Sequence, residues 1–203
     1  MSEYLQDEDL RQMIQTKQLY IRPLLEESQI GPLSVDFRIG TEFLVSFQGR
    51  DPYINASHTD KEQGKPFLSF QVTRRRLGET FLLHPNQTVL ASSLEYIKLP
   101  NNLFANLSMR STYSRLGLVM SSYVQPGYSG CISIELTNNS KNTVKLAVGA
   151  RLFQASFVRI DRALSYFDHP RKYLCQVRPQ VADFSGDEDL AILNRIRDNY
   201  FSV

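Results

Sequence analysis

The chain has 203 residues, enough for one domain with a sizeable core, and its 42% apolar and 22% charged residues are ordinary for a globular protein. A formal net charge of +2 is too small to attract a polyanion, and no apolar run approaches the length of a bilayer span. We therefore expect no nucleic acid and no membrane as partner. The polar, acidic first residues lack the features of a secretory signal, which favours a cytoplasmic location.

The first predicted element is a short N-terminal helix. Leu10, Met13 and Ile14 form an apolar face at helical spacing, and three acidic residues at 7–9 precede them. Acidic side chains are favourable in a first helical turn because they complement the helix dipole. The helix should therefore begin near residue 7.

The long central part of the chain predicts an all-β fold. Between residues 29 and 157, brief runs of Val, Ile, Phe, Tyr and Leu are separated by Gly, Pro, Asn and Ser at short intervals. This spacing is typical of a sandwich or barrel. The polar segment 47–66 interrupts the pattern and is expected to be a surface loop or an insertion without catalytic groups.

Beyond residue 181 the composition changes. Leu190, Leu193, Ile196 and Tyr200 follow an acidic stretch at helical spacing, which predicts a C-terminal helix. We therefore divide the chain into a β domain at 1–183 and a helical appendage at 184–203.

Neither cysteines nor histidines indicate a metal site. Cys131 and Cys175 are too few for a disulfide framework and lack metal-binding spacing, and the three histidines are scattered. We expect both thiols to be reduced. The three arginines at 74–76 lack interleaved aromatic residues, which favours a solvated loop or a subunit contact.

The most informative segment is RSTYSRLGL at 110–118. It carries Arg110 and Arg115 beside several hydroxyl groups, and guanidinium groups offer forked donors that match phosphate. After the turn at 126–127, an alternating run predicts a strand that holds Glu135 on rigid backbone, partly buried and suited to acid/base work. A structural salt bridge between Glu135 and Arg115 is the alternative.

These segments resemble the signature segments of the dCTP deaminase family, within the trimeric dUTPase superfamily. The resemblance covers about residues 5 to 183 in order, and several separate motifs agree. The motifs are RSTYSRLGL at 110–118, VQPGYSGCISIE at 124–135, GARLFQ at 149–154, GPLSVDFRIG at 31–40 and FLLHPNQTVLASSLEYIKL at 81–99. The resemblance implies a distorted jelly-roll or barrel, a homotrimer with sites between subunits, and conversion of dCTP or a related cytosine nucleotide to dUTP and ammonia.

The resemblance also implies roles for individual residues. Glu135 would relay protons for metal-free attack of water on cytosine, while Ser111 and Arg115 would orient the water and polarise the base. The implied nucleotide-binding residues are Arg110 and Ser111 at the triphosphate, Gln125 at the sugar, Gln154 at the pyrimidine edge, and Tyr166, Lys172, Tyr173 and Gln176 in or near a closing tail. No tightly bound cofactor is expected, and Mg²⁺ would arrive with the triphosphate.

Three departures from the family pattern define the alternatives. The segment 119–125 is short, Gln125 stands where the family places aspartate, and Met109 stands where it places glycine. A neutral amide cannot act as a general base, which disfavours hydrolysis to dUMP. A non-catalytic or altered-specificity nucleotide-binding or regulatory protein is therefore the alternative. The joint presence of Ser111, Arg115 and Glu135 favours an enzyme.

Overall fold

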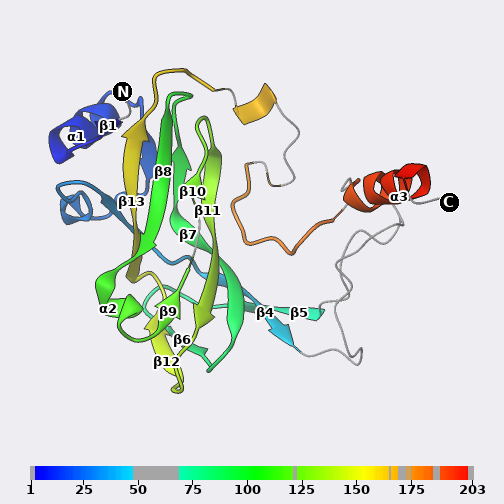
Figure 1. The fold of residues 1–203 in the computed structure, drawn as a ribbon. Coiled ribbons are helices and arrows are strands. Elements are labelled where there is room, and N and C mark those ends of the chain that lie inside the picture. Colours follow the sequence, from blue (N-terminus) through cyan, green and yellow to red (C-terminus); the bar gives the residue numbers. More distant parts are fainter. Residues whose placement is uncertain are drawn as a thin grey trace. The chain divides into compact units, whose positions relative to one another are not determined.

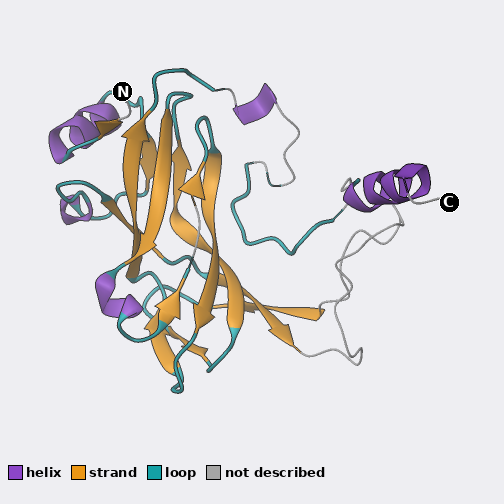
Figure 2. Ribbon diagram, in the orientation of Figure 1, coloured by secondary structure: helices purple, strands orange, loops and turns teal. Residues whose placement is uncertain are grey.

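The computed structural model describes residues 3–47, 69–120, 123–164, 166–168, 173, 175–184 and 188–200. Residues 1–45 and 72–180 form one compact unit, and residues 46–71 with 181–203 form a second. Strands make up most of the first unit (Figures 1 and 2), which confirms the predicted all-β class. Apart from Phe47, the loop expected at 47–66 lies outside the described residues.

Five antiparallel strands form the first sheet, in the order β1-β13-β8-β10 with β3 also paired to β13. In β13, Phe153 and Phe157 are buried, whereas Gln154 between them is half-buried. This alternation follows from the two-residue period of a strand and places Gln154 away from the core. The strands are Glu3–Tyr4 (β1), Val35–Arg38 (β3), Leu103–Met109 (β8), Tyr123–Val124 (β10) and Arg151–Arg159 (β13).

Six strands form the second sheet, in the order β5-β4-β7-β11-β9, with β2 paired to β7. The pairing of β7 with β11 is irregular between Cys131 and Ser133, so that the β7 residues 93–95 bulge out of register. The strands are Tyr20–Arg22 (β2), Glu42–Phe47 (β4), Ser69–Arg74 (β5), Thr88–Lys98 (β7), Leu118–Val119 (β9) and Ser129–Asn138 (β11). Separately, β6 (Thr80–Leu83) pairs with β12 (Val144–Ala147).

One apolar cluster contains residues from both sheets. Phe37 of β3 stacks on Phe153 of β13 at 5.5 Å between ring centroids, and Phe43 stacks on Phe81 at 4.1 Å. Each buried side chain of this size contributes about 1.5–3 kcal/mol relative to an exposed one. Strands β3 and β13 both contribute to this core, and they carry Asp36, Arg38, Arg151 and Gln154, which are described below.

Both predicted helices are present. Helix α1 (Asp7–Gln15) buries Leu10 and Met13, and the Asp9 carboxylate accepts a hydrogen bond from the backbone N–H of Gln6 at 3.3 Å. Helix α3 (Asp189–Tyr200) lies in the second unit. The remaining helical turns are η1 (Glu27–Gln29), α2 (Ser111–Ser114) and η2 (Tyr166–Asp168). None of the helices in the described ranges is long and apolar enough to cross a membrane.

Candidate functional site

The predicted phosphate segment follows β8 directly. Arg110 has extended backbone angles, and one helical turn then forms α2, with Arg115 donating its N–H to the Ser111 carbonyl at 3.0 Å. Gly117 ends this turn with a φ of +84°, a conformation that favours glycine. Ser111 and Arg115 are both exposed. The structure therefore places both side chains on one short surface turn.

Glu135 lies on β11, opposite Leu90 of β7. The expectation that it is partly buried is wrong for the single chain, because Ile134 and Leu136 occupy the core face and Glu135 is exposed on the other. Within the described residues no ion pair joins Glu135 to Arg115, so the alternative of a structural salt bridge is not realised in one chain. The chain thus keeps both charges available at its surface.

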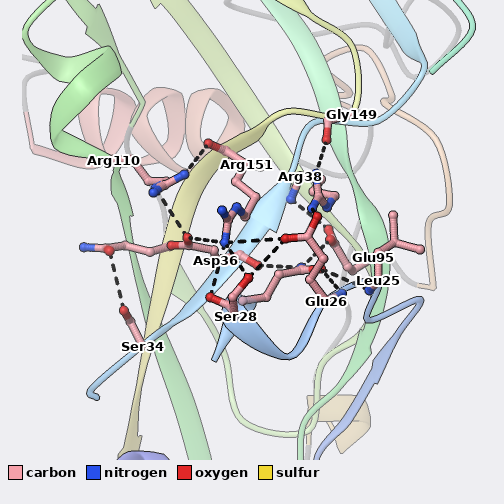
Figure 3. Close-up of polar contacts among 12 residues, drawn as sticks. Leu25, Glu26, Ser28, Ser34, Asp36, Arg38, Glu95, Arg110, Gly149 and Arg151 are labelled. Carbon is pink, nitrogen blue, oxygen red and sulfur yellow. Dashed lines mark hydrogen bonds and ion pairs between the residues drawn. The ribbon is translucent and has the colours of Figure 1, made fainter. Parts of the chain in front are cut away.

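An ion-pair cluster surrounds Asp36 of β3 (Figure 3). The Asp36 Oδ2 atom lies 3.4 Å from Arg110 Nε and 3.8 Å from Arg151 Nη1. Arg110 also donates from Nη1 to the Arg151 carbonyl at 3.2 Å. Burial raises the pKa of Asp36, although Arg110, Arg151 and Arg38 each act to lower it. The three guanidinium groups therefore offset part of the cost of placing a carboxylate here.

The cluster extends to the turn η1. Arg151 Nη1 donates to both the carbonyl and the hydroxyl of Ser28 at 3.2 Å, and lies 4.0 Å from Glu26 Oε2. Glu26 Oε1 in turn accepts from Arg38 Nη2 at 2.9 Å. Arg38 donates from Nη1 to the Gly149 carbonyl at 2.8 Å. These contacts join η1, β3 and β13 into one polar network.

Glu95 marks the buried end of this network. It lies in the β7 bulge, is 0% exposed, and accepts hydrogen bonds from Gln29 Nε2 at 3.0 Å and from the Arg38 N–H at 2.9 Å. Burial raises the pKa of Glu95, against the opposing effect of these hydrogen bonds. Both carboxylate oxygens have partners, so Glu95 is a structural group that ties β7 to β3.

Gln154, the predicted base reader, lies opposite Ser108 of β8 and Asp36 of β3. Its Nε2 donates to the Ser108 hydroxyl at 3.1 Å, and its Oε1 accepts from the Ser34 hydroxyl at 3.5 Å. The structure therefore brings Gln154 and Arg110 to the same group of three strands. Asp36 and Arg151 were missed by sequence reasoning, although both stand inside the motifs that carried the resemblance.

The predicted tail residues that the structure describes are Tyr166, Tyr173 and Gln176. Gln176 is only 5% exposed, and its carbonyl accepts the Cys131 N–H of β11 at 2.8 Å. Tyr166 is also buried and packs edge-on against Tyr128 at 5.7 Å. Tyr173 is half-buried. The proposed nucleotide contacts of these residues stay predictions.

Gln125 and Lys172 are the other predicted nucleotide contacts, and their roles also stay predictions. Gln125 is half-buried between β10 and β11, and its carbonyl accepts the Tyr128 N–H at 3.1 Å. Lys172 lies outside the described residues. Met109, at the end of β8, is half-buried and packs against the core.

The buried Cys131 is not poised for nucleophilic chemistry. Both thiols are free, and burial raises the pKa of the Cys131 thiol to about 11, so that it stays protonated near neutral pH. In the part of the chain that the structure describes, no three His, Cys, Asp or Glu side chains gather into a metal-binding group. The chemistry available here is that of carboxylate, guanidinium, hydroxyl and amide groups.

Comparisons with known proteins agree with these motifs. A family model described as dCTP deaminase-like matches residues 4–160. The chain is 34% identical over 193 residues to a dUMP-forming dCTP deaminase of Methanobrevibacter smithii, covering 92% of this chain and 97% of that protein. It is 32% identical over 193 residues to a dCTP deaminase of Natronomonas pharaonis, covering 91% and 96%.

Among solved structures, a 2'-deoxycytidine 5'-triphosphate deaminase from Agrobacterium tumefaciens has a similar fold. The TM-score is 0.60 at 18% identity, and the match covers 78% of this chain and 48% of that one. At this identity the likeness supports the fold alone. It agrees with the two-sheet architecture described above.

Proposed function

The chain belongs to the dCTP deaminase-like family, and from this premise we propose that it hydrolyses dCTP to dUTP and ammonia in pyrimidine deoxynucleotide metabolism. One observation carries the proposal. Ser111, Arg115 and Glu135 are all exposed, and within the described residues no ion pair occupies Arg115 or Glu135. A ligand can therefore reach the groups that the reaction needs.

The proposed reaction needs no metal-bound hydroxide. Glu135 accepts a proton from water as the water oxygen attacks the ring carbon that bears the exocyclic amine, and the proton passes to the ring nitrogen. Glu135 then takes the hydroxyl proton of the tetrahedral intermediate and gives it to the amine, so that the carbon–nitrogen bond breaks, ammonia leaves, a carbonyl forms and Glu135 is again ionised. Arg115 polarises the base, and Ser111 orients the water. Proton transfer by one positioned group typically contributes about 10²–10⁴-fold to the rate.

Arg110, directly before this turn, and Ser111, within it, are proposed triphosphate ligands, and the Arg110 side chain is 35% exposed. Lys172, Tyr173 and Gln176 would grip the phosphates from the tail, Tyr166 would support them, and Gln125 and Gln154 would face the nucleoside. Mg²⁺ would come with the triphosphate and be held mainly by phosphate oxygens and water. No other cofactor is needed for the proposed reaction.

We propose a homotrimer with the site between subunits. Ser111 and Arg115 lie in the turn between β8 of the first sheet and β9, which pairs with β11, the strand of Glu135; even so, within the described part of one chain no ion pair joins Glu135 to Arg115. A neighbouring chain would supply the missing half of the site. Mixing Glu135→Gln subunits with Arg115→Ala subunits should then restore part of the activity that each variant lacks.

The test is incubation with dCTP and Mg²⁺, with chromatography for nucleotides and a coupled assay for ammonia. We expect Glu135→Gln to abolish measurable turnover and to retain nucleotide binding, because the change removes proton transfer and keeps the shape. Glu27→Gln, on an exposed carboxylate of η1, is the matched control. Full turnover in Glu135→Gln would refute the mechanism. Binding of dCTP without any product in the wild type would instead favour the non-catalytic regulatory alternative.

A second candidate product is dUMP, because the Methanobrevibacter smithii relative is named as dUMP-forming. Gln125 weighs against it, since an amide cannot activate the water that would cleave the triphosphate. Release of pyrophosphate together with ammonia would favour dUMP. Release of ammonia alone would favour dUTP.

A further inference from the structure

Asp36 makes contacts that suit a supporting role at the phosphate site. Its side chain is 16% exposed, and its carboxylate lies between Arg110, at 3.4 Å, and Arg151, at 3.8 Å (Figure 3). We infer that Asp36 is a positioning residue that aligns the guanidinium group of Arg110 for a ligand's phosphates. This inference rests on the proposed function, in which Arg110 binds the triphosphate.

The contacts of Arg110 leave part of its guanidinium group for a ligand. Nε lies 3.4 Å from Asp36 Oδ2 in an ion pair, and Nη1 donates to the Arg151 carbonyl at 3.2 Å, so two nitrogens contact the protein. Within the described residues, Nη2 makes no hydrogen bond. A planar guanidinium group recognises phosphate by direction as well as by charge, so fixing two of its nitrogens also fixes where the third points.

Asp36 is itself held in place. Gln29 Nε2 donates to the Asp36 carbonyl at 2.9 Å and to the buried Glu95 carboxylate at 3.0 Å, which ties this part of β3 to the core. Arg151, the second partner of Asp36, is held by the Ser28 carbonyl and hydroxyl at 3.2 Å. The alignment of Arg110 is therefore supported by groups that do not depend on a ligand.

Two effects of Asp36 on phosphate binding oppose each other. Its negative charge repels phosphate and weakens the local positive field, whereas its contact with Nε holds Arg110 in one orientation. The Arg110 side chain is only one-third exposed. Without the Asp36 contact, repulsion between the guanidinium groups of Arg110 and Arg151 would push Arg110 away, and its guanidinium group would adopt the phosphate-binding orientation less often. We therefore expect alignment to outweigh repulsion.

Asp36→Asn should raise the KM for dCTP and weaken binding of inorganic tripolyphosphate by about tenfold, by analogy with the lower end of the range for residues that orient metal-binding side chains. kcat should change less than twofold, since the reacting atoms do not touch Asp36. Asp36→Glu should recover part of the loss because it restores the charge. Glu27→Gln, which removes an exposed carboxylate from neighbouring η1, is the control and should leave KM unchanged.

The deciding measurement is a double-mutant cycle with Arg110→Ala, in which tripolyphosphate affinity, KM and kcat are measured for the wild type, both single variants and the double variant. The effect of Asp36→Asn should vanish when Arg110 is absent. Wild-type or tighter binding in Asp36→Asn, or an undiminished effect in the Arg110→Ala background, would overturn the inference. If Asp36→Asn does not fold, Asp36→Glu is used in the same cycle with the same expectation of coupling.

The two proposals fail in different ways. If tripolyphosphate binding shows coupling between residues 36 and 110 but dCTP is not deaminated, the positioning role stands and the proposed function is refuted. Deamination without coupling between residues 36 and 110 would keep the function and remove the positioning role. A wild-type protein that binds neither tripolyphosphate nor dCTP would refute both.

Discussion

Gly130→Ala should detach the tail from β11. Gly130 has a φ of +152°, and a Cβ atom there would lie 2.8 Å from the Gln176 carbonyl oxygen and 2.8 Å from the Tyr128 hydroxyl oxygen. That carbonyl accepts the Cys131 N–H at 2.8 Å, and the Tyr128 hydroxyl donates to the Cys131 carbonyl at 2.6 Å. The new methyl group therefore enters the contact that holds residue 176 against the strand.

The expected loss follows from those contacts. Each of the two hydrogen bonds contributes about 0.5–1.5 kcal/mol. An unfavourable backbone conformation adds about 1–3 kcal/mol. Allowing for partial relaxation, Gly130→Ala should lower the free energy of unfolding by about 2–4 kcal/mol. Gly78→Ala is the matched control, because Gly78 has a φ of +83° and a Cβ atom added there would meet nothing within 4 Å, so only about 1–2 kcal/mol of conformational cost applies.

Urea unfolding measures the two free energies, and hydrogen exchange followed by mass spectrometry reports on the tail. We expect faster exchange in peptides covering 175–180 and the start of β11 in Gly130→Ala, with native rates there in Gly78→Ala. Equal destabilisation of the two variants, with unchanged exchange in the tail, would refute the reasoning. Such a result would mean that the Gln176 contact contributes little to the fold.

Three further predictions concern Glu95, Phe153 and Arg115. Burial raises the pKa of Glu95 above its ordinary value of 4.5, so the native state binds this proton more tightly than the unfolded state does. The stability that this proton contributes is present below pH 4.5 and is lost as pH rises through the folded pKa. Glu95→Gln should flatten this pH dependence of the free energy of unfolding, measured with urea between pH 4 and pH 8. Phe153→Ala, which removes the stack on Phe37, should cost about 3–5 kcal/mol by the same measurement, and a loss under 1 kcal/mol would contradict it. Arg115→Ala should weaken dCTP binding and lower kcat by about a hundredfold, and wild-type kinetics would remove Arg115 from the site.

Sequence reasoning succeeded where the signal is local. Helix α1 and strand β11 both carry their own periodicity, so a short window of residues contains the information that defines them. The turn after β8 also forms, and its role as a phosphate-binding segment, inferred from Arg110, Ser111 and Arg115 being close in sequence, stays a prediction. The spacing of the apolar runs predicted the all-β class, which the two sheets confirm, and the family resemblance added the jelly-roll type.

The Asp36 cluster could not be predicted in that way. Asp36, Arg110 and Arg151 lie in or directly after three different strands, and their contacts depend on which residues of β3 and β8 face β13. A single sequence does not reveal which strands pair or in which register they do so. The burial of Gln176 was missed for the same reason, since it depends on a contact between residues 131 and 176 that no local pattern reveals.

Glu95 and Glu135 contrast a structural carboxylate with the proposed proton-transfer group. Glu95 is buried, and each of its oxygens accepts a hydrogen bond, so its charge is fully engaged by the fold. Glu135 stands on an adjacent strand of the same sheet, yet it is exposed and has no ion-pair partner within the described residues. A proton-transfer group has to exchange partners during the reaction, and a fully engaged carboxylate cannot do so without disrupting its surroundings. The fold therefore engages Glu95 in its own hydrogen bonds and leaves Glu135 accessible, as the proposed proton transfer requires.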